Sequence, residues 1–377
     1  MPESLIDLRL LPLALFLLFC LIFIIEQVFY LAIFRKLSLV QKKSLKKIHQ
    51  GVSVVICAHN EYHHLKENLP LILEQKYPEF EVVVVNHASD DDTGFLLARL
   101  EEKYPNLKAV EIKEDLNFFT GKKFPLSIGI KSARYDIILL TEAGCKPASG
   151  DWISLFEENF RPDAEIVLGY GAYNRTKGFL NKVIRFDTAS QAIRYLSFAV
   201  ANMPYTGVGR NLSYLKNIFY RNKGFISHYQ IQSGEDELFI NRVANRKNTT
   251  ILLDPGSFTF SDPKQSFSKW ISQKQRHLST STHYKVRDKI LQGIYFTATW
   301  FFYCLFILLL SLNISVFVVL GLFFLRLLSQ YMVMSKCMGR LNEKDLVPFF
   351  PVYELLLLLL NTGIIVSNGF RKSKKWK

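Results

Sequence analysis

The sequence of 377 residues contains only five cysteines, and no two of them form a Cys-x-x-Cys pair. Structural zinc sites draw their ligands from closely spaced cysteines and histidines, so this sparse set predicts no zinc site. Two of the five, Cys20 and Cys304, fall in long apolar runs. The cysteines therefore indicate neither a metal centre of this kind nor a disulfide framework.

Acidic residues are also scarce, because 33 Asp and Glu stand against 47 Lys and Arg, which gives a formal net charge of +14. Many of the basic residues lie beside apolar runs, where they suit the anionic head groups of lipids better than nucleic acid. Residues 35–47 contain no acidic residue at all, and their basic residues are Arg35, Lys36, Lys42, Lys43, Lys46 and Lys47. We expect membrane lipids among the partners, and no nucleic acid.

Long apolar runs are present at both ends of the chain. Residues 8–34 are nearly all apolar, with Glu26 and Gln27 as interruptions, and about 20 apolar residues suffice to cross a bilayer as a helix. No small-residue cleavage site marks this run as a secretory signal, so we expect an uncleaved anchor. The basic residues after it favour the cytosol, which predicts an external N-terminus and a cytosolic segment at residues 50–288.

The C-terminal part is again apolar. Residues 290–334 are broken near Ser311-Leu312-Asn313, which predicts a helical hairpin, and a further apolar run covers residues 349–367. Three full spans would carry the basic tail, which includes Arg371 and Lys377, to the outside, against the positive-inside rule. Either the last run is re-entrant or interfacial, or the hairpin is miscounted. We expect a multi-pass protein of the cell (inner) membrane with an anchor and basic stretch at 1–48, a cytosolic domain at 49–288 and membrane-associated helices with a basic tail at 289–377.

Between the apolar ends, predicted strands alternate with predicted helices. The strands are expected at residues 51–58, 80–86, 107–113 and 135–141, and the helices at 62–76, 93–103 and 123–133. This alternation predicts a parallel α/β sheet, and ligands of such sheets bind outside the carboxyl ends of the strands. Three polar clusters fall at that edge, namely His59-Asn60-Glu61, Asn86-His87-Ala88 and Glu142-Ala143-Gly144.

Seven short motifs, in this order, make residues 50–280 resemble the family 2 glycosyltransferases. The motifs are Cys57-Ala58-His59-Asn60-Glu61, Ser89-Asp90-Asp91-Asp92-Thr93, Gly121-Lys122-Lys123, Thr141-Glu142-Ala143-Gly144-Cys145-Lys146-Pro147, Gly207-Val208-Gly209-Arg210-Asn211-Leu212-Ser213-Tyr214, Gly234-Glu235-Asp236-Glu237-Leu238 and Gln273-Lys274-Gln275-Arg276-His277. The resemblance implies an α/β GT-A fold, with a Rossmann-like, mostly parallel sheet flanked by helices, and transmembrane helices at both ends. It implies an inverting hexosyltransferase that uses a nucleotide-diphosphate sugar, expected to be UDP-linked, and a hydroxyl of a lipid-linked or membrane-proximal glycan acceptor.

The resemblance also assigns residues to the nucleotide sugar, namely Asn60, Glu61, His87, Lys122, Glu142 and Arg276. His87 departs from the family, which commonly has an aspartate there to bind the base. Lys122 at the start of a helix suits a diphosphate, and the planar guanidinium of Arg276 suits the leaving group. The alternatives are a helix N-cap for Asn60 and a solvated side chain for Lys122.

The motif Glu235-Asp236 occupies the family's catalytic-base position. Asp236 is expected to take the proton of the attacking hydroxyl, and Glu235 to steady a neighbouring group. The acceptor is expected near Gly209, Asn211, Gln273 and His277, and His277 replaces the family's tryptophan. The alternatives are an exposed acidic helix start for the first motif, and a lipid-facing patch for the basic residues Lys269, Lys274, Arg276 and Lys285.

The turn Glu142-Ala143-Gly144 stands where the family usually has an Asp-x-Asp metal site. Mg²⁺ and Mn²⁺ take oxygen ligands, and Gly144 offers none at the position that generally binds the metal directly. We expect a divalent cation at Glu142 with weak or unusual dependence. Another carboxylate completes the site, or Lys and Arg replace the metal, or the protein is a non-catalytic membrane subunit that binds sugar nucleotides. A processive polymer synthase is a third hypothesis, although few apolar runs are available to form its channel.

Overall fold

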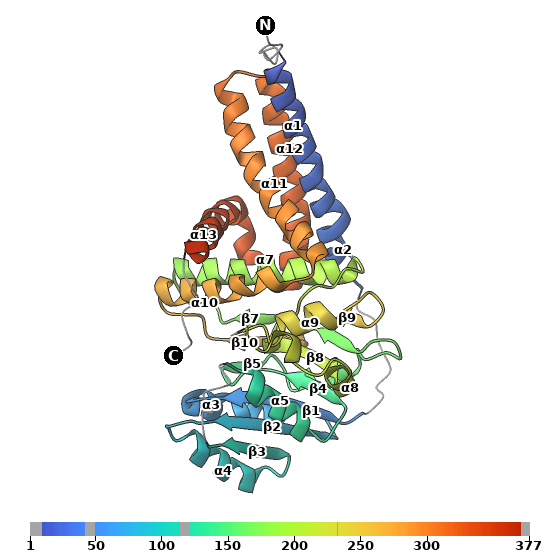
Figure 1. The fold of residues 1–377 in the computed structure, drawn as a ribbon, viewed down its shortest axis with the longest axis vertical. Helices are drawn as coiled ribbons and strands as arrows, with labels where there is room; N and C mark the ends of the chain where they lie inside the picture. Colours follow the sequence, from blue (N-terminus) through green and yellow to red (C-terminus); the bar gives the residue numbers. More distant parts are fainter. Residues whose placement is uncertain (1–9, 42–49, 114–120, 232, 371–377) are drawn as a thin grey trace. The chain divides into compact units, whose positions relative to one another are not determined.

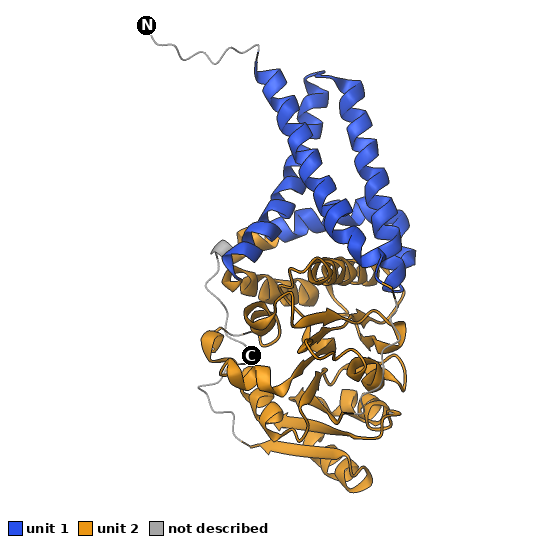
Figure 2. Cartoon of the chain, turned by 90° about the vertical axis from the view of Figure 1, so that its right-hand side faces the viewer, with its two compact units in different colours: residues 1–40, 285–362 blue, residues 41–284, 363–377 orange. Residues whose placement is uncertain are grey.

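The computed structural model describes residues 10–41, 50–113, 121–231 and 233–370. The chain forms two compact units (Figure 2), a helical unit of Met1–Val40 and Lys285–Thr362 and a sheet unit of Gln41–Tyr284 and Gly363–Lys377. The basic residues between Lys42 and Lys47, and the tail from Arg371, lie outside the described residues. The cytosolic location expected for the first of these, and the side of the membrane on which the tail lies, therefore remain untested.

The sheet unit is built on a seven-stranded sheet (Figure 1) with strand order β3-β2-β1-β4-β8-β6-β9. Its strands are β1 (Val52–Ala58), β2 (Phe80–His87), β3 (Leu107–Ile112), β4 (Ile137–Leu140), β6 (Ile166–Leu168), β8 (Leu212–Leu215) and β9 (Thr249–Ile251). The four strands predicted from the first half are all present and parallel, which confirms that prediction. Strand β8 runs antiparallel to both β4 and β6, so the sheet is mixed.

A second, three-stranded sheet has the order β5-β10-β7. Its strands are β5 (Cys145–Pro147), β7 (Gly171–Tyr173) and β10 (Thr259–Ser261). Strand β5 follows directly on the turn that contains Glu142, and β10 pairs with it antiparallel. The second sheet therefore fixes the C-terminal side of that turn.

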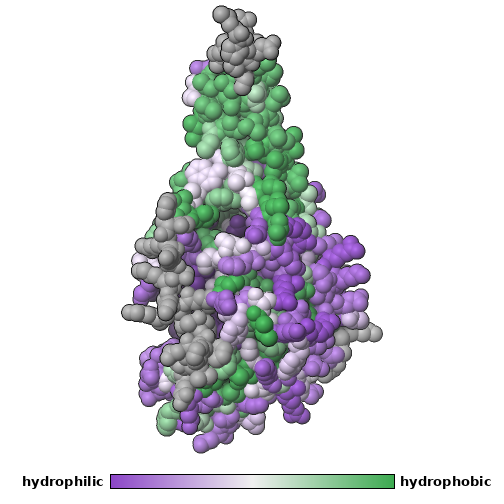
Figure 3. All heavy atoms as spheres, viewed as in Figure 1, coloured by the Kyte–Doolittle hydropathy of each residue, from purple (hydrophilic) through white to green (hydrophobic). Residues whose placement is uncertain are grey.

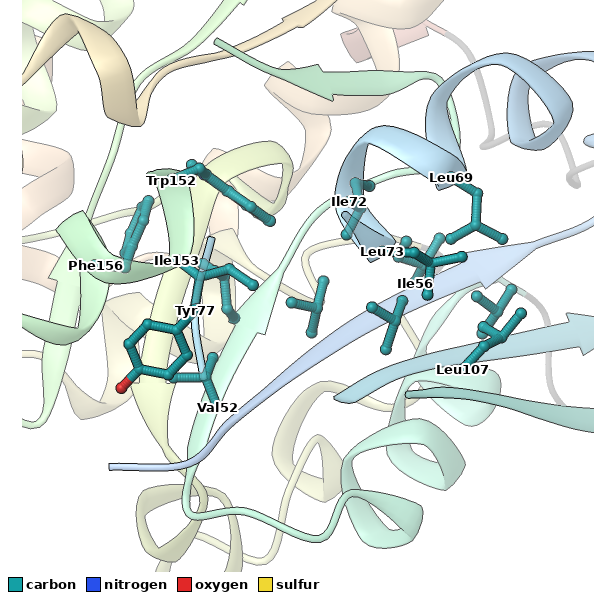
Figure 4. Packing of buried hydrophobic residues seen from close by; sticks show 14 of the residues in the cluster. Val52, Ile56, Leu69, Ile72, Leu73, Tyr77, Leu107, Trp152, Ile153 and Phe156 are labelled. Carbon is teal, nitrogen blue, oxygen red and sulfur yellow. The ribbon is translucent and has the colours of Figure 1, made fainter. Parts of the chain in front are cut away.

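Helices cover both faces of the large sheet. They are α3 (Tyr62–Leu73), α4 (Thr93–Lys103), α5 (Lys123–Ser132), α6 (Trp152–Glu157), α7 (Phe179–Val200), α8 (Lys216–Arg221), α9 (Glu237–Val243) and α10 (Phe267–Thr280). Figure 4 shows Leu69 and Ile72 of α3 and Trp152 of α6 packed in one cluster with Val52 and Ile56 of β1. On α5, a Cβ at Gly129 would lie 2.6 Å from Val55 of β1, so the glycine allows this helix to approach the sheet closely.

Helix α7, with 22 residues, was not predicted from the sequence. Fourteen of its residues are buried, among them the polar Asn181, Arg185 and Asp187. A helix that is buried on most of its circumference shows no single apolar stripe, and this stripe is the pattern by which helices are recognised in a sequence.

The helical unit contains the long apolar helices. They are α1 (Leu11–Gln27) with its continuation η1 (Val28–Phe34) and α2 (Arg35–Ser38), then α11 (Val286–Ser311), α12 (Val316–Arg340) and α13 (Phe350–Phe370), whose last residues belong to the sheet unit. In the described part of the chain, four helical segments are long and apolar enough to cross a membrane. Many of their large apolar side chains are exposed, and Figure 3 shows this apolar surface.

The predicted hairpin is present, and its turn contains Ser315 with a positive φ of 45°. The side of the membrane on which α13 ends stays a prediction.

A buried charged cluster joins the helices of this unit. Arg326 of α12 donates to both oxygens of Glu26 on α1, at 2.6 and 2.9 Å. Its remaining N–H groups donate to Glu354 of α13 at 3.2 Å, to the Tyr303 hydroxyl of α11 at 3.2 Å and to Gln330 Oε1 at 3.1 Å. All five N–H groups of the guanidinium therefore have an acceptor, as a buried charge requires.

Candidate active site

The loops after β1 and β2 are joined through Asn60. Its side-chain oxygen accepts the backbone N–H of Asp90 at 2.8 Å, and its own backbone N–H donates to the Ser89 hydroxyl at 2.9 Å. Asn60 has a positive φ of 56°, which asparagine tolerates better than most residues. The alternative that Asn60 is the N-cap of the following helix is wrong, because Glu61 occupies that position.

Glu61 and His87 lie at the predicted edge of the sheet. Glu61 Oε2 is 2.5 Å from Nδ1 of His64, one turn further along α3. His87 is buried, its carbonyl accepts the Nδ1–H of His59 at 2.7 Å, and its ring meets that of Phe124 edge-on. The structure places both residues after the carboxyl ends of β1 and β2, while their contacts with a nucleotide stay predictions.

An ion pair occupies the acidic turn after β4. Lys122, the N-cap of α5, donates to Glu142 Oε1 at 2.8 Å, and both side chains are half-exposed. The Lys122 ammonium lowers the pKa of Glu142 to about 2, although the surrounding protein partly desolvates this half-exposed carboxylate, and Arg210 and His277 act in the same direction as Lys122. Burial opposes the charge of Lys122, but Glu142 and Glu235 raise the pKa of its ammonium above the usual value. The two groups therefore stay charged and paired at neutral pH.

The residues at this turn do not fit a divalent-metal site of the Asp-x-Asp kind. The Glu142 carboxylate forms an ion pair with the Lys122 ammonium, and Gly144 has no side chain. A Cβ at Gly144 would lie 3.9 Å from the ring of His64, so there is room for a larger residue. Within the described ranges, no three His, Cys, Asp or Glu side chains come together in a way that could hold a metal ion. The expected divalent cation stays a prediction, and the contact with His64 could not be found from the sequence because it joins two separate elements.

Asp236 and Gly209, which the motifs assign to different roles, are in direct contact. Asp236 is the N-cap of α9, and its two oxygens accept the N–H of Glu237 at 2.8 Å and of Gly209 at 2.5 Å. A Cβ at Gly209 would lie 3.1 Å from Asp236 Oδ2, which is a tight contact, so the absence of a side chain eases this close approach. Burial, assisted by Glu235 and Glu237, raises the pKa of Asp236 to about 7 against these two hydrogen bonds. A carboxyl group with this pKa is well matched to general-base work near neutral pH.

The two lysines at the start of α5 reach different parts of the site. Lys122 pairs with the acidic turn, whereas Lys123 donates to the carbonyl oxygens of Ile231 and Ser233, just before Glu235. Burial lowers the pKa of Lys123 to about 8, although Glu235 and Asp236 oppose this effect. Sequence reasoning overlooked Lys123, although it adjoins Lys122 in the same motif.

The side-chain amide of Asn211 is buried and forms hydrogen bonds with three other residues of the protein. It donates to the carbonyls of Tyr170 and Ser257 at 2.9 and 2.8 Å and accepts from Trp152 at 3.0 Å. These contacts give Asn211 a packing role, and its acceptor role stays a prediction. The neighbouring Arg210 was missed. Its guanidinium lies 4.4 Å from the ring centroid of Tyr173 and donates to Ser261 at 3.0 Å.

Helix α10 carries the Gln273, Arg276 and His277 motif. Gln273 donates to the Tyr173 hydroxyl at 3.3 Å, His277 Nδ1 lies 3.0 Å from Glu237 Oε1, and the Arg276 side chain is exposed. The alternative of a lipid-facing basic patch is wrong for Lys274, because Lys274 is buried and lies 2.6 Å from Asp187 of α7. The contact of His277 with Glu237 thus places the motif beside the start of α9, where Asp236 is the N-cap.

Comparisons with known proteins show which family and which fold the chain resembles. Residues 53–220 match the family described as "Glycosyl transferase family 2". The chain is 26% identical over 234 residues to "Probable glycosyltransferase YdaM" of Bacillus subtilis (strain 168), an alignment that covers 60% of this chain and 54% of that protein. It is 26% identical over 143 residues to the poly-beta-1,6-N-acetyl-D-glucosamine synthase of Staphylococcus aureus (strain COL), which covers 37% of this chain and 33% of that protein. The chain therefore spans about half or less of the length of these relatives.

The structure is also similar to that of the mannosyltransferase PcManGT from Pyrobaculum calidifontis in complex with GDP-Man and Mn²⁺. The TM-score is 0.60, with 18% sequence identity, and the match covers 96% of this chain and 99% of that chain. At this identity the similarity shows the fold, which is the α/β GT-A fold.

Proposed function

We propose that this chain, whose residues 53–220 match the family 2 glycosyltransferases, is an inverting hexosyltransferase with a nucleotide-diphosphate sugar as donor and a lipid-linked or membrane-proximal glycan as acceptor. The observation that carries this proposal is the geometry of Asp236, a part-buried carboxyl group that accepts the N–H groups of Gly209 and Glu237 and whose pKa the surrounding protein raises to about 7. A protein that only bound ligands would have no use for a base matched to neutral pH. The catalytic unit faces the cytosol of a multi-pass membrane protein, as the basic stretch after α1 and the apolar helices suggest.

The residues of the site can carry out transfer in one displacement. Asp236 accepts the proton of the acceptor hydroxyl, whose oxygen attacks the anomeric carbon on the face opposite the nucleotide. The bond between that carbon and the diphosphate oxygen breaks, and its electron pair leaves with the diphosphate. Lys122, Arg210 and Arg276 supply positive charge for this leaving group. One displacement inverts the configuration of the anomeric carbon.

The donor is a nucleotide-diphosphate sugar, with UDP as the expected nucleotide. One relative is solved with GDP-Man, and the name of another contains N-acetyl-D-glucosamine, so both nucleotides need testing. The test is release of nucleoside diphosphate by the purified protein from a panel of UDP- and GDP-linked sugars, with and without Mn²⁺. Binding of these donors with no release of nucleoside diphosphate under any condition would support the alternative, a non-catalytic subunit that binds sugar nucleotides. The reason to consider this alternative is that Gly144 stands where the family has its second aspartate.

Metal dependence is expected to be weak in the wild type, and Gly144→Asp is expected to tighten it. The substitution adds a second carboxylate at a position that has room for it, next to Glu142. The measurement is the Mn²⁺ concentration for half-maximal transfer. Gly144→Asn is the matched control, because it adds the same volume without the charge. Tight Mn²⁺ activation of the wild type that neither variant changes would show that another carboxylate already completes the site.

The pH dependence of transfer should report the ionisation of Asp236. Only the carboxylate form accepts a proton, so kcat/KM should rise with pH on the acid side of its profile, and the midpoint of this rise should lie near pH 7, the pKa of Asp236. Glu235→Gln removes a neighbouring charge that raises this pKa, so its rise should begin at lower pH. A wild-type rate that is already at its plateau at about pH 5 would mean that the base is an ordinary carboxylate.

A further inference from the structure

Glu142 is influenced by three cationic side chains from three separate elements. Lys122 comes from α5, Arg210 from η2 (Gly209–Asn211) and His277 from α10. Lysine and arginine are charged throughout the physiological pH range, whereas histidine loses its charge near neutral pH. Of these three cations, His277 is therefore the one whose contribution can be switched by pH.

Glu237 fixes the ring of His277 from the start of α9. One oxygen of Glu237 lies 3.0 Å from His277 Nδ1, and the other accepts the hydroxyl of Thr280, one turn later on α10. The Tyr284 hydroxyl approaches the same oxygen at 3.5 Å. Glu237 is 16% exposed and His277 48%, so the carboxylate is the more buried partner and the imidazole is half-exposed. No hydrogen bond of His277 Nε2 occurs within the described residues, which leaves this nitrogen available to a ligand.

The surroundings of His277 favour the imidazolium form. Burial opposes the charge, but the hydrogen bond and charge of Glu237 raise the pKa of His277, and Asp236 adds to the effect. Arg276 on its own helix is the opposing charge, and Glu142 in the turn after β4 also interacts electrostatically with His277. The carboxylates of Asp236 and Glu237 thus outweigh the guanidinium of Arg276.

We propose that His277, oriented by Glu237, is a catalytic cation that donates its Nε2–H to the departing diphosphate. The proposal rests on the proposed transfer reaction and deepens it. When the bond between the anomeric carbon and the diphosphate oxygen breaks, the electron pair stays on that oxygen, and the imidazolium stabilises the new charge without giving up its proton. Glu237 is a positioning residue that fixes the ring and its charge. This role differs from that of an aromatic residue stacked on the acceptor sugar, which the family's tryptophan suggests for the position.

Two substitutions in the full-length protein separate the role of charge from that of stacking. His277→Lys keeps a cation that does not titrate near neutral pH, so transfer should stay within about tenfold of wild type and lose its decline at alkaline pH. His277→Trp restores the family residue without charge, so transfer should fall on the order of 100-fold. The measurement is the pH profile of nucleoside diphosphate release from the donor found in the panel. A tryptophan variant that is as active as the wild type, beside an inactive lysine variant, would overturn the proposal and leave the transfer function intact.

Binding of UDP and GDP, measured by calorimetry across the same pH range, gives a second readout that does not require turnover. The wild type should lose affinity as His277 loses its proton, whereas His277→Lys should not. Because the phosphates titrate identically in both proteins, the difference between the two curves reports the residue at this position. A wild type that binds these nucleotides without turning over any donor would refute the proposed function, and the same difference curve would still decide whether His277 binds the diphosphate.

Glu237→Gln tests the positioning role. The amide keeps the size of the side chain but not its charge, so the alkaline decline of transfer should move to lower pH. Thr280→Val is the comparison variant, because it removes the Thr280 hydroxyl from the second oxygen of Glu237 and from the His277 backbone carbonyl but leaves the pair between Glu237 Oε1 and His277 Nδ1, so its alkaline decline should stay in place. A Glu237→Gln protein that is slower but has an unchanged alkaline decline would show that Glu237 only holds the two helices together, and the assignment would be wrong.

Discussion

Replacing Asp236 by asparagine is expected to lower sugar transfer by about 10²- to 10⁴-fold, while the affinity for UDP or GDP changes little. The amide has the shape of the carboxyl group, and its oxygen can still accept the N–H of Gly209 or Glu237, but it cannot accept the proton of the attacking hydroxyl. Transfer is measured as nucleoside diphosphate release under saturating donor and acceptor, and affinity by calorimetry. A change in kcat with an unchanged nucleotide Kd is the expected signature.

Asp163→Asn is the matched control, because Asp163 is an exposed residue of the sheet unit away from the motifs. It should retain wild-type transfer. If Asp236→Asn also retains near-wild-type turnover, another group takes the proton and the base assignment is wrong. If it loses both turnover and nucleotide affinity, the carboxylate contributes to donor binding. The pH profile then distinguishes this contribution from a role as the base.

Replacing Arg326 by methionine is expected to lower the free energy of unfolding of the helical unit by about 3–5 kcal/mol. Arg326 is fully buried, and its removal leaves the carboxylate of Glu26, which is also fully buried, without its partner. Unpaired charges among apolar helices are among the costliest defects in a membrane protein. The measurement is the thermal unfolding midpoint of the full-length protein in detergent. Lys336→Met is the matched control, because Lys336 is an exposed residue of the same helix and its loss should change the midpoint little.

A triple variant distinguishes the loss of a charge from the loss of the arginine side chain. Combining Arg326→Met with Glu26→Gln and Glu354→Gln removes the charges together, so most of the stability should return. If the triple variant is as unstable as Arg326→Met alone, the packing of the arginine, which also lies 4.6 Å over the ring of Phe302, is the main contribution. A wild-type midpoint in the single variant would show that the cluster contributes nothing to stability.

The strands of the first half could be predicted because their signal is local. The β-branched run of β1 and the polar residues directly after it specify a buried parallel strand with a ligand edge, whatever surrounds them. The same holds for the position of Asp236 after a glycine at a helix start, which the motif order suggested. Helix α7 escaped prediction because its buried polar residues, such as Asp187, are satisfied by partners on other elements, here Lys274 of α10. Because Lys274 is far from Asp187 in the sequence, the residues around Asp187 do not reveal this partner.

By itself, the sequence determined the fold class, the apolar helices and the order of the motifs, since these depend on periodicity and composition within short segments. Only the tertiary structure decided how the motif residues are used. It paired Glu142 with Lys122, joined Gly209 to Asp236 and placed His277 against Glu237, residues that lie between 20 and 40 positions apart in the chain. The physical reason is that a side chain's charge and hydrogen bonds depend on its neighbours in space, and a folded sheet brings those neighbours from separate loops to one edge.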